Sequence, residues 1–232
     1  MVFERLSSGK EYGDYLDVLL SKEKKNDVTE IRDMLMVLFL AGRDSTLGAF
    51  VWATYELCCN PEWILLLRKE IETVGTDNDV IPFKEIEKYH LHRAVLFETI
   101  RLWPGLPKNA RVAMEDDVLP SINGSSFPAV KISKGDFVLW SDFSMMRDPG
   151  VWGPDAEKFN PARHLDVNGS PGEMLSTYEF ISIISMIIRH FDIVPVQLQL
   201  NQRNLVEALS SFMEGPFRVT IKPREGTILS QL

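Results

Sequence analysis

Cysteine is scarce in this sequence, and its scarcity excludes several kinds of protein. Of 232 residues only Cys58 and Cys59 are cysteine, and they are adjacent. Neighbours in a helix point about 100° apart, and neither thiol has another cysteine with which to pair. A disulfide framework and a cysteine-based zinc site are therefore excluded, and we expect a reducing compartment.

Long hydrophobic runs are also missing. The best one, from Met34 to Gly42, is interrupted by Arg43 and Asp44. Such a run is too short to span a bilayer, and charges at its end would be costly there. The first five residues lack the charged start and apolar run of a signal peptide. We therefore expect no transmembrane segment in this chain and a buried helix in its place.

Blocks of positive charge are absent as well. The net charge is −8 and the sequence pI is about 5.1, which argues against a nucleic-acid partner. Hydrophobic residues make up 45% and charged residues 25%, a balance typical of a soluble globular protein.

Helical patterns dominate what is present. From Thr29 to Cys59 there is no proline and most positions are apolar, which predicts one long helix buried nearly all round. Asp27 and Glu30 have the spacing of a capping box before it. Asn60 and Pro61 predict the start of a second helix that ends at Gly75. Further helices are expected at 14–20, 84–88, 91–102 and 173–191.

Strand patterns are fewer and shorter. Residues 112–120 and 130–140 carry β-branched and aromatic residues bounded by turn formers, and the tail at 216–222 alternates in hydrophobicity. The order is long helices, strands, a helix and a closing strand. The fold class expected is therefore an α-dominated α+β fold.

Glu98 and Arg101 are three residues apart and share one face of the helix expected at 91–102. Most such pairs are surface salt bridges. This one lies among apolar residues, and charges in that setting are usually buried and need further partners. Arg163, in an aromatic-x-Pro-x-Arg loop, is a candidate third member of a network that pins the loop to the helix.

The segment from Ala41 to Thr46 lies at the middle of the longest helix. Asp44 beside the hydroxyl of Thr46 is a plausible proton-delivery pair in an apolar helix. A kinked core helix with a satisfied threonine hydroxyl is the alternative, since glycine, serine and threonine all favour bending.

Four motifs in this order resemble the C-terminal half of a cytochrome P450. The motifs are Ala41–Thr46, the pair Glu98 and Arg101, the segment 146–157, and the loop Phe159–Arg163. The resemblance covers the chain from about residue 25 to its end. The sequences of these motifs are most similar to those of fungal members that hydroxylate alkanes and fatty acids.

The resemblance implies a truncated P450 fold, with residues 1–232 forming a single partial domain. It implies a haem cofactor, with Thr46 and Asp44 serving oxygen activation and Arg111 reaching a haem propionate. Glu98, Arg101 and Arg163 would be a structural network. No residue is assigned as a metal ligand.

The resemblance also implies partners and a location. The substrate would be an apolar small molecule, and an NADPH-P450 reductase would supply electrons. Family members sit on the cytosolic side of the endoplasmic-reticulum membrane; without the anchor this chain would be cytosolic. Without the N-terminal half, the long helix would expose apolar surface and the isolated chain would aggregate readily.

The family's haem-ligand cysteine loop is the main departure. Only Leu165–Gly172 lies between His164 and Glu173, and Ser170 falls nearest the cysteine position. We interpret this as a deletion between about 164 and 173. Helix rise places Cys58 roughly 18 Å from Thr46, too far for a shared haem. Surface or capping roles are expected for the histidines at 90, 92, 164 and 190.

Three hypotheses remain from the sequence. The first is a haem-thiolate monooxygenase that is inactive as written. The second is a truncated or mis-spliced P450 fragment that binds no haem. The third is a small helical interaction protein with coincidental motifs.

Overall fold

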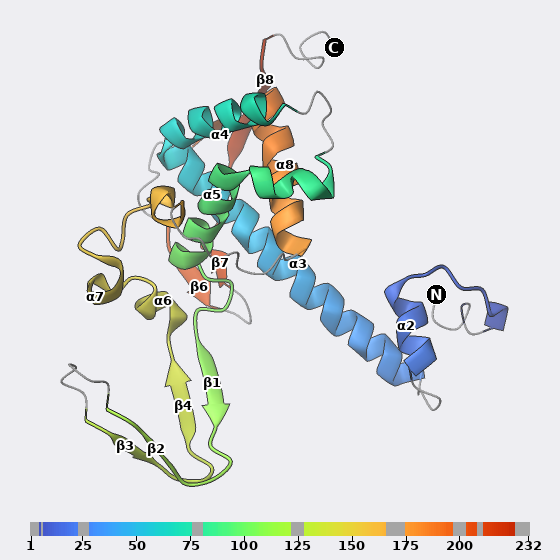
Figure 1. Ribbon diagram of the computed structural model, residues 1–232, viewed down its shortest axis with the longest axis vertical. Helices are drawn as coiled ribbons and strands as arrows, with labels where there is room; N and C mark the ends of the chain where they lie inside the picture. Colours follow the sequence, from blue (N-terminus) through green and yellow to red (C-terminus); the bar gives the residue numbers. More distant parts are fainter. Residues whose placement is uncertain are drawn as a thin grey trace. The chain divides into compact units, whose positions relative to one another are not determined.

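The computed structural model describes residues 5, 7–22, 28–75, 81–121, 128–165, 175–196, 203–207 and 211–225 (Figure 1). The chain divides into two compact units, residues 1–46 and 47–232. Helix α3 (Val28–Cys59) begins in the first unit and ends in the second. Asp27 of the expected capping box lies outside the described residues.

An ion cluster organises the start of the first unit. The Arg5 guanidinium binds the carboxylates of Asp14, at 2.7 Å, and Asp17. Asp17 also accepts hydrogen bonds from the backbone N–H groups of Tyr12 and Gly13. These contacts stabilise the chain just before α2 (Tyr15–Lys22) and its first turn.

Helix α3 has the expected length, but the expectation that it is buried nearly all round is wrong. Its early turns expose large apolar side chains at Met34, Met36, Val37, Leu38, Phe39 and Leu40. In the first unit its described neighbour is the eight-residue α2, which covers only one side. The expected exposure of apolar surface on this helix is confirmed. By length and composition α3 could also cross a bilayer, a criterion that soluble core helices meet equally well.

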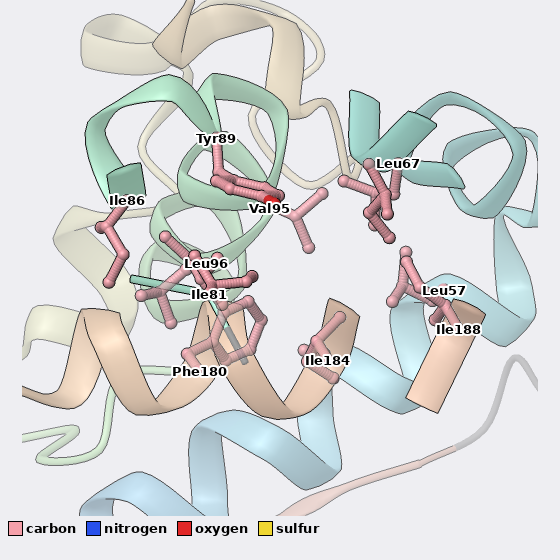
Figure 2. Close-up of a cluster of buried hydrophobic side chains, with 13 residues drawn as sticks. Leu57, Leu67, Ile81, Ile86, Tyr89, Val95, Leu96, Phe180, Ile184 and Ile188 are labelled. Carbon is pink, nitrogen blue, oxygen red and sulfur yellow. The ribbon is translucent and has the colours of Figure 1, made fainter. Parts of the chain in front are cut away.

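The core of the second unit forms where four helices and one short 3-10 helix meet. These are the end of α3, α4 (Pro61–Val74), η1 (Phe83–Lys88), α5 (His90–Leu102) and α8 (Leu175–His190). Leu57, Leu67, Leu96 and Ile184 point into one cluster from α3, α4, α5 and α8 (Figure 2). Helix α8, expected at 173–191, buries an apolar face at Ile181, Ile184 and Ile188.

The ends of α4 follow the predicted signals. Pro61 occupies the first turn after Asn60, and Gly75 ends the helix in a left-handed conformation (φ 71°) with its N–H bonded to Ile71 O. A residue with a Cβ would be strained at that φ. Leu67 and Ile71 are buried, whereas the neighbouring Leu66 is exposed.

Four two-stranded antiparallel sheets complete the described part of the fold. The expected strand at 112–120 is two strands, β1 (Asn109–Val112) and β2 (Asp117–Leu119); that at 130–140 is β3 (Val130–Ile132) and β4 (Phe137–Trp140). β1 pairs with β4 and β2 with β3, so the four form one extended arm (Figure 1). The predicted α-dominated α+β class is confirmed.

The C-terminal strands were only partly anticipated. β8 (Val219–Pro223) corresponds to the expected closing strand and pairs with β5 (Phe191–Pro195). β5 begins directly after α8, at a residue that the pattern assigned to the helix. The pair β6 (Leu205–Glu207) and β7 (Ser211–Met213) had no sequence signal that we recognised.

Truncating Ile184 tests the core. We expect Ile184→Ala to lower the free energy of unfolding by about 2–5 kcal/mol, because the side chain is buried among the packed helices. Leu139→Ala on the exposed arm is the control, with an expected change within about 0.5 kcal/mol. Urea unfolding followed by circular dichroism measures both, and equal effects would contradict this core assignment.

Candidate functional site

Asp44 and Thr46 lie on α3 in the first unit and are both half-buried. The helix continues without interruption through Gly42 and this segment. Ser45, between them, turns its hydroxyl back and donates to Ala41 O at 2.7 Å. The proposed proton-delivery pair therefore sits on regular helix, one turn after a glycine.

Arg111 lies on β1 in the second unit and is exposed. Its guanidinium lies 5.4 Å from the ring centroid of Trp140 on the paired strand β4, and Nη1 donates to the carbonyl of Ala110. The charge therefore remains accessible to a ligand, while the aromatic ring steadies the side chain.

Glu98 is the centre of a buried cluster in the second unit. Its carboxylate is fully buried on α5, and Arg101 of the same helix binds it with two nitrogens, Nε at 2.7 Å and Nη2 at 2.8 Å. The backbone N–H of Asn160 donates to it at 2.9 Å, and Arg163 Nε at 3.1 Å. The structure thus brings the three predicted network residues together.

Arg101 links the cluster to the segment that precedes η2 (Pro161–His164). Its Nη1 donates to the carbonyls of Met146 and Ala156, and Nη2 to that of Lys158. The guanidinium also lies 5.0 Å from the ring centroid of Trp152. One buried cation therefore satisfies three loop carbonyls as well as a carboxylate, which the geometry of guanidinium permits.

Arg163 holds the same loop from its other end. Nη1 donates to the carbonyl of Trp152 and Nη2 to that of Asp155, whose carboxylate lies 2.7 Å from Nη2. With both arginines engaged, the loop around α6 (Asp142–Met145) and α7 (Pro149–Trp152) is fastened to α5 (Figure 1).

The electrostatics keep Glu98 ionised. Burial alone would raise its pKa, but the hydrogen bonds from Arg101, His164 and Asn160 outweigh burial and lower the pKa to about 2. The charged form of Arg163 is stabilised as well. Burial lowers the pKa of Arg163, but Asp155 and Glu98 raise it by more, so the net shift is upward. Glu98, Arg101 and Arg163 are therefore charged together and form an ion network.

His164 is a member that the sequence did not reveal. Its Nε2 lies 2.9 Å from Glu98 Oε2, and its ring packs against Phe97 and Trp152. The expectation of a surface or capping role does not describe this residue. The only signal was its position immediately after Arg163.

Glu56 extends the set of buried carboxylates at the end of α3. Its Oε1 accepts from Trp103 Nε1 at 2.7 Å, and Trp103 stacks on Trp52 with ring centroids 3.6 Å apart. Burial raises the pKa of Glu56, partly offset by these hydrogen bonds. The contacts fasten α3 to the last turn of α5, so the helix that carries Glu98 is held at both faces.

The two thiols are poor ligands for a metal that needs thiolate. Cys58 and Cys59 are free and half-buried at the end of α3. Burial raises the pKa of Cys58 to about 11 and also raises that of Cys59. Both side chains are therefore protonated near neutral pH in the metal-free protein, and a metal that binds a thiolate would have to displace a proton held more tightly than usual. Ser170, the other residue considered, lies outside the described residues.

Removing the Glu98 carboxylate should destabilise the protein strongly. We expect Glu98→Ala to cost about 3–5 kcal/mol of unfolding free energy, because the buried Arg101 loses its charge partner. Glu85→Ala removes a carboxylate whose partner, Lys88, is exposed and 3.5 Å away, and should change stability by less than about 1 kcal/mol. Chemical denaturation of both variants and the parent measures these changes in unfolding free energy. A small change for Glu98→Ala would refute the structural role of the network.

The Glu98 network should also make stability depend on acid. The ordinary pKa of this carboxyl is 4.5 and its pKa in the folded protein is about 2, so the unfolded chain takes up the proton first. Its stabilisation is complete above pH 4.5 and is lost as the pH falls toward 2, by at most about 1.4 kcal/mol per pH unit. Urea unfolding at several pH values measures the slope, which Glu98→Gln should reduce; an unchanged slope contradicts the assignment.

Comparison with known proteins identifies the family of this chain. The sequence model of the family described as Cytochrome P450 matches residues 3–199. The chain is 33% identical over 198 residues to a cytochrome P450 monooxygenase, cyp1, of Mycosarcoma maydis, covering 73% of this chain and 29% of that protein. It is 30% identical over 205 residues to cytochrome P450 52A10 of Candida maltosa, covering 79% of this chain and 40% of that protein.

A third relative is a bifunctional cytochrome P450/NADPH–P450 reductase 2 of Bacillus subtilis strain 168. It is 30% identical over 214 residues, covering 86% of this chain and 19% of that protein. The chain thus spans well under half the length of these curated relatives. With its family match over most of its residues, the chain belongs to the cytochrome P450 family.

Proposed function

We propose that this chain carries the C-terminal framework of a haem-thiolate monooxygenase, and that the chain as written does not catalyse oxygen insertion. The observation that carries the first part is the buried Glu98 carboxylate bound at once by Arg101 of its own helix and Arg163 of a distant loop. In this reading the network is structural, because its charges are all paired and none faces a reacting group.

The fit between this chain and haem decides the second part. Bound haem would supply the iron that activates oxygen, with a cysteine thiolate as its protein ligand. The chain's thiols do not fit that role, since Cys58 and Cys59 are half-buried and protonated. A serine hydroxyl does not ionise near neutral pH and is a poor ligand for iron. No step of turnover is therefore assigned to this chain.

A deletion between His164 and Glu173 accounts best for the missing ligand. The framework on its N-terminal side, ending at His164, is bound to Glu98, and the helix on its C-terminal side packs into the core. A loss confined to the intervening loop would leave both in place. The alternative is a truncated or mis-spliced product that never binds haem, and it is favoured by the exposed apolar turns of α3.

For a complete enzyme built on this framework we propose an apolar substrate of alkane or fatty-acid type. Support comes from the resemblance to fungal members and from fungal relatives at 30–33% identity. Asp44 and Thr46 would hold and pass a proton on the long helix, and exposed Arg111 would neutralise a haem propionate. An NADPH–P450 reductase is the proposed electron donor, as two bacterial relatives are named as fusions with one. A membrane-bound location, as in the fungal family, completes the proposal.

The spectrum of the reduced carbon monoxide complex tests the lack of thiolate ligation. The purified chain is supplied with haem, reduced and exposed to carbon monoxide, with the Mycosarcoma maydis relative as positive control. We expect the red-shifted Soret band of a thiolate-ligated haem from the relative and none from this chain, because both thiols are protonated.

A thiolate band from this chain would overturn the proposal. The double variant Cys58→Ser, Cys59→Ser then shows whether these thiols provide it, since loss of the band identifies them as ligands. Sequencing the encoding DNA between the codons of His164 and Glu173 separates the two alternatives: a coding segment there indicates a mis-spliced form of an ordinary enzyme.

A further inference from the structure

The α4–α5 joint contains a buried ion cluster that the Glu98 network does not use. Glu70 of α4 points its carboxylate at the first turn of α5, where Oε1 accepts from the backbone N–H of Leu91 at 2.7 Å. Oε2 accepts from the backbone N–H of His92 at 3.2 Å and lies 2.7 Å from His92 Nδ1. One carboxylate on α4 therefore binds two backbone donors and a side chain of α5.

This carboxylate replaces the helix's own cap. The residue at the N-cap position of α5 is Tyr89, and its side chain makes no capping hydrogen bond. The first N–H groups of a helix need partners and favour a negative charge nearby. Glu70 supplies both from a neighbouring helix, so that the start of α5 depends on the joint between α4 and α5.

His92 is the proton-sensitive part of this joint. The ring is fully buried, and with Glu70 at Nδ1 the neutral ring carries its hydrogen there. Nε2 is buried with no hydrogen-bond partner among the described residues. A second proton would sit on Nε2 and create a buried donor without an acceptor, which is costly.

Among the charged groups near His92, Glu70 is the one that contacts its ring. The ring of Tyr89 meets the His92 ring edge to face, with centroids 5.4 Å apart. From α4, Arg68 is occupied by the carbonyls of Ile188 and Phe191. The other charged or titratable groups of the elements packed against α5 are Glu62, Lys69 and Glu72 on α4, Arg163 and His164 on η2, and Tyr178, Glu179, Arg189 and His190 on α8; α5 itself adds His90, Arg93, Glu98 and Arg101. Among the described contacts, none of them pairs with His92.

We propose that Glu70 and His92 form a proton-sensitive joint that fixes the start of α5 when His92 is neutral and releases it when His92 is protonated. Because α5 carries Glu98 and Arg101, release of its first turn loosens the helix on which the ion network is built. The joint works whether or not the chain binds haem, so it stands apart from the function proposed above.

The direction of the pH dependence follows from burial. Burial lowers the pKa of His92 below its usual value of 6.5, and the Glu70 carboxylate opposes this without reversing it. The unfolded chain therefore takes up the proton first, and the stabilisation is complete above pH 6.5 and lost as the pH falls through the folded pKa. The stabilisation from His92 begins to fall at a higher pH, near 6.5, than that from Glu98, near 4.5.

Nuclear magnetic resonance of the whole chain tests the joint without any substitution. The His92 ring is titrated while amide hydrogen exchange is followed at Leu91 and His92. We expect the ring to titrate below pH 6.5 and the protection factors of the two amides to fall in step with it, by about tenfold for each unit of pKa depression. A ring that titrates at or above 6.5, or protection that ignores its titration, overturns the proposal.

A matched pair of variants gives a second test. His92→Asn keeps a side-chain N–H donor near the Nδ1 position but cannot titrate, so its folding equilibrium should lose the pH dependence that the parent shows as the pH falls below about 6.5. His90→Asn makes the same change at an exposed position two residues earlier and should keep the parent's pH dependence. If His92→Asn retains that dependence, or His90→Asn abolishes it, the joint is not the cause. Should His92→Asn fail to fold, the titration of the parent chain still decides.

Discussion

A buried carboxylate that must stay charged is the constraint on which the second unit depends. Glu98 is fully removed from water, and only its contacts with Arg101, Asn160, Arg163 and His164 make that burial tolerable. Asn160, Arg163 and His164 come from a loop some sixty residues further along the chain, so the loop cannot leave without taking three of the four partners from a buried carboxylate. The apolar core supplies most of the packing, while this ion network fixes which loop conformation goes with it.

The same logic applies at other junctions of this unit. Arg68 of α4 binds the carbonyl of Ile188 in the last turn of α8, and the Phe191 carbonyl and Asp192 carboxylate of β5. Glu56 ties α3 to Trp103, and Glu70 ties α4 to the start of α5. In two of these cases, Arg68 and Glu70, a charged side chain from one helix binds backbone groups at the end of another. Helix ends carry unpaired backbone groups, and here tertiary contacts provide the partners in place of local caps.

The sequence predicted these features to the extent that they were local. The helices followed from periodicity and from signals such as Pro61 and Gly75, and the pair Glu98 and Arg101 followed from its spacing and apolar flanks. Contacts between distant segments were harder. Nothing near Glu70 or His92 indicates that they meet, and the carbonyls that bind Arg101 carry no side-chain signature. The burial of α3 was overestimated because apolar composition shows that a helix needs covering without showing that neighbours are there to cover it.

The exposed turns of α3 also have a consequence for the protein in a cell. A stretch that presents Met36, Val37, Leu38 and Phe39 to water offers the kind of segment that chaperones hold and proteases cut. The abundance of the chain then depends on how fast quality-control machinery captures it as well as on how stably its core folds. Its lifetime in the cell therefore depends on turns of the same helix that carries the buried Trp52 and Leu57.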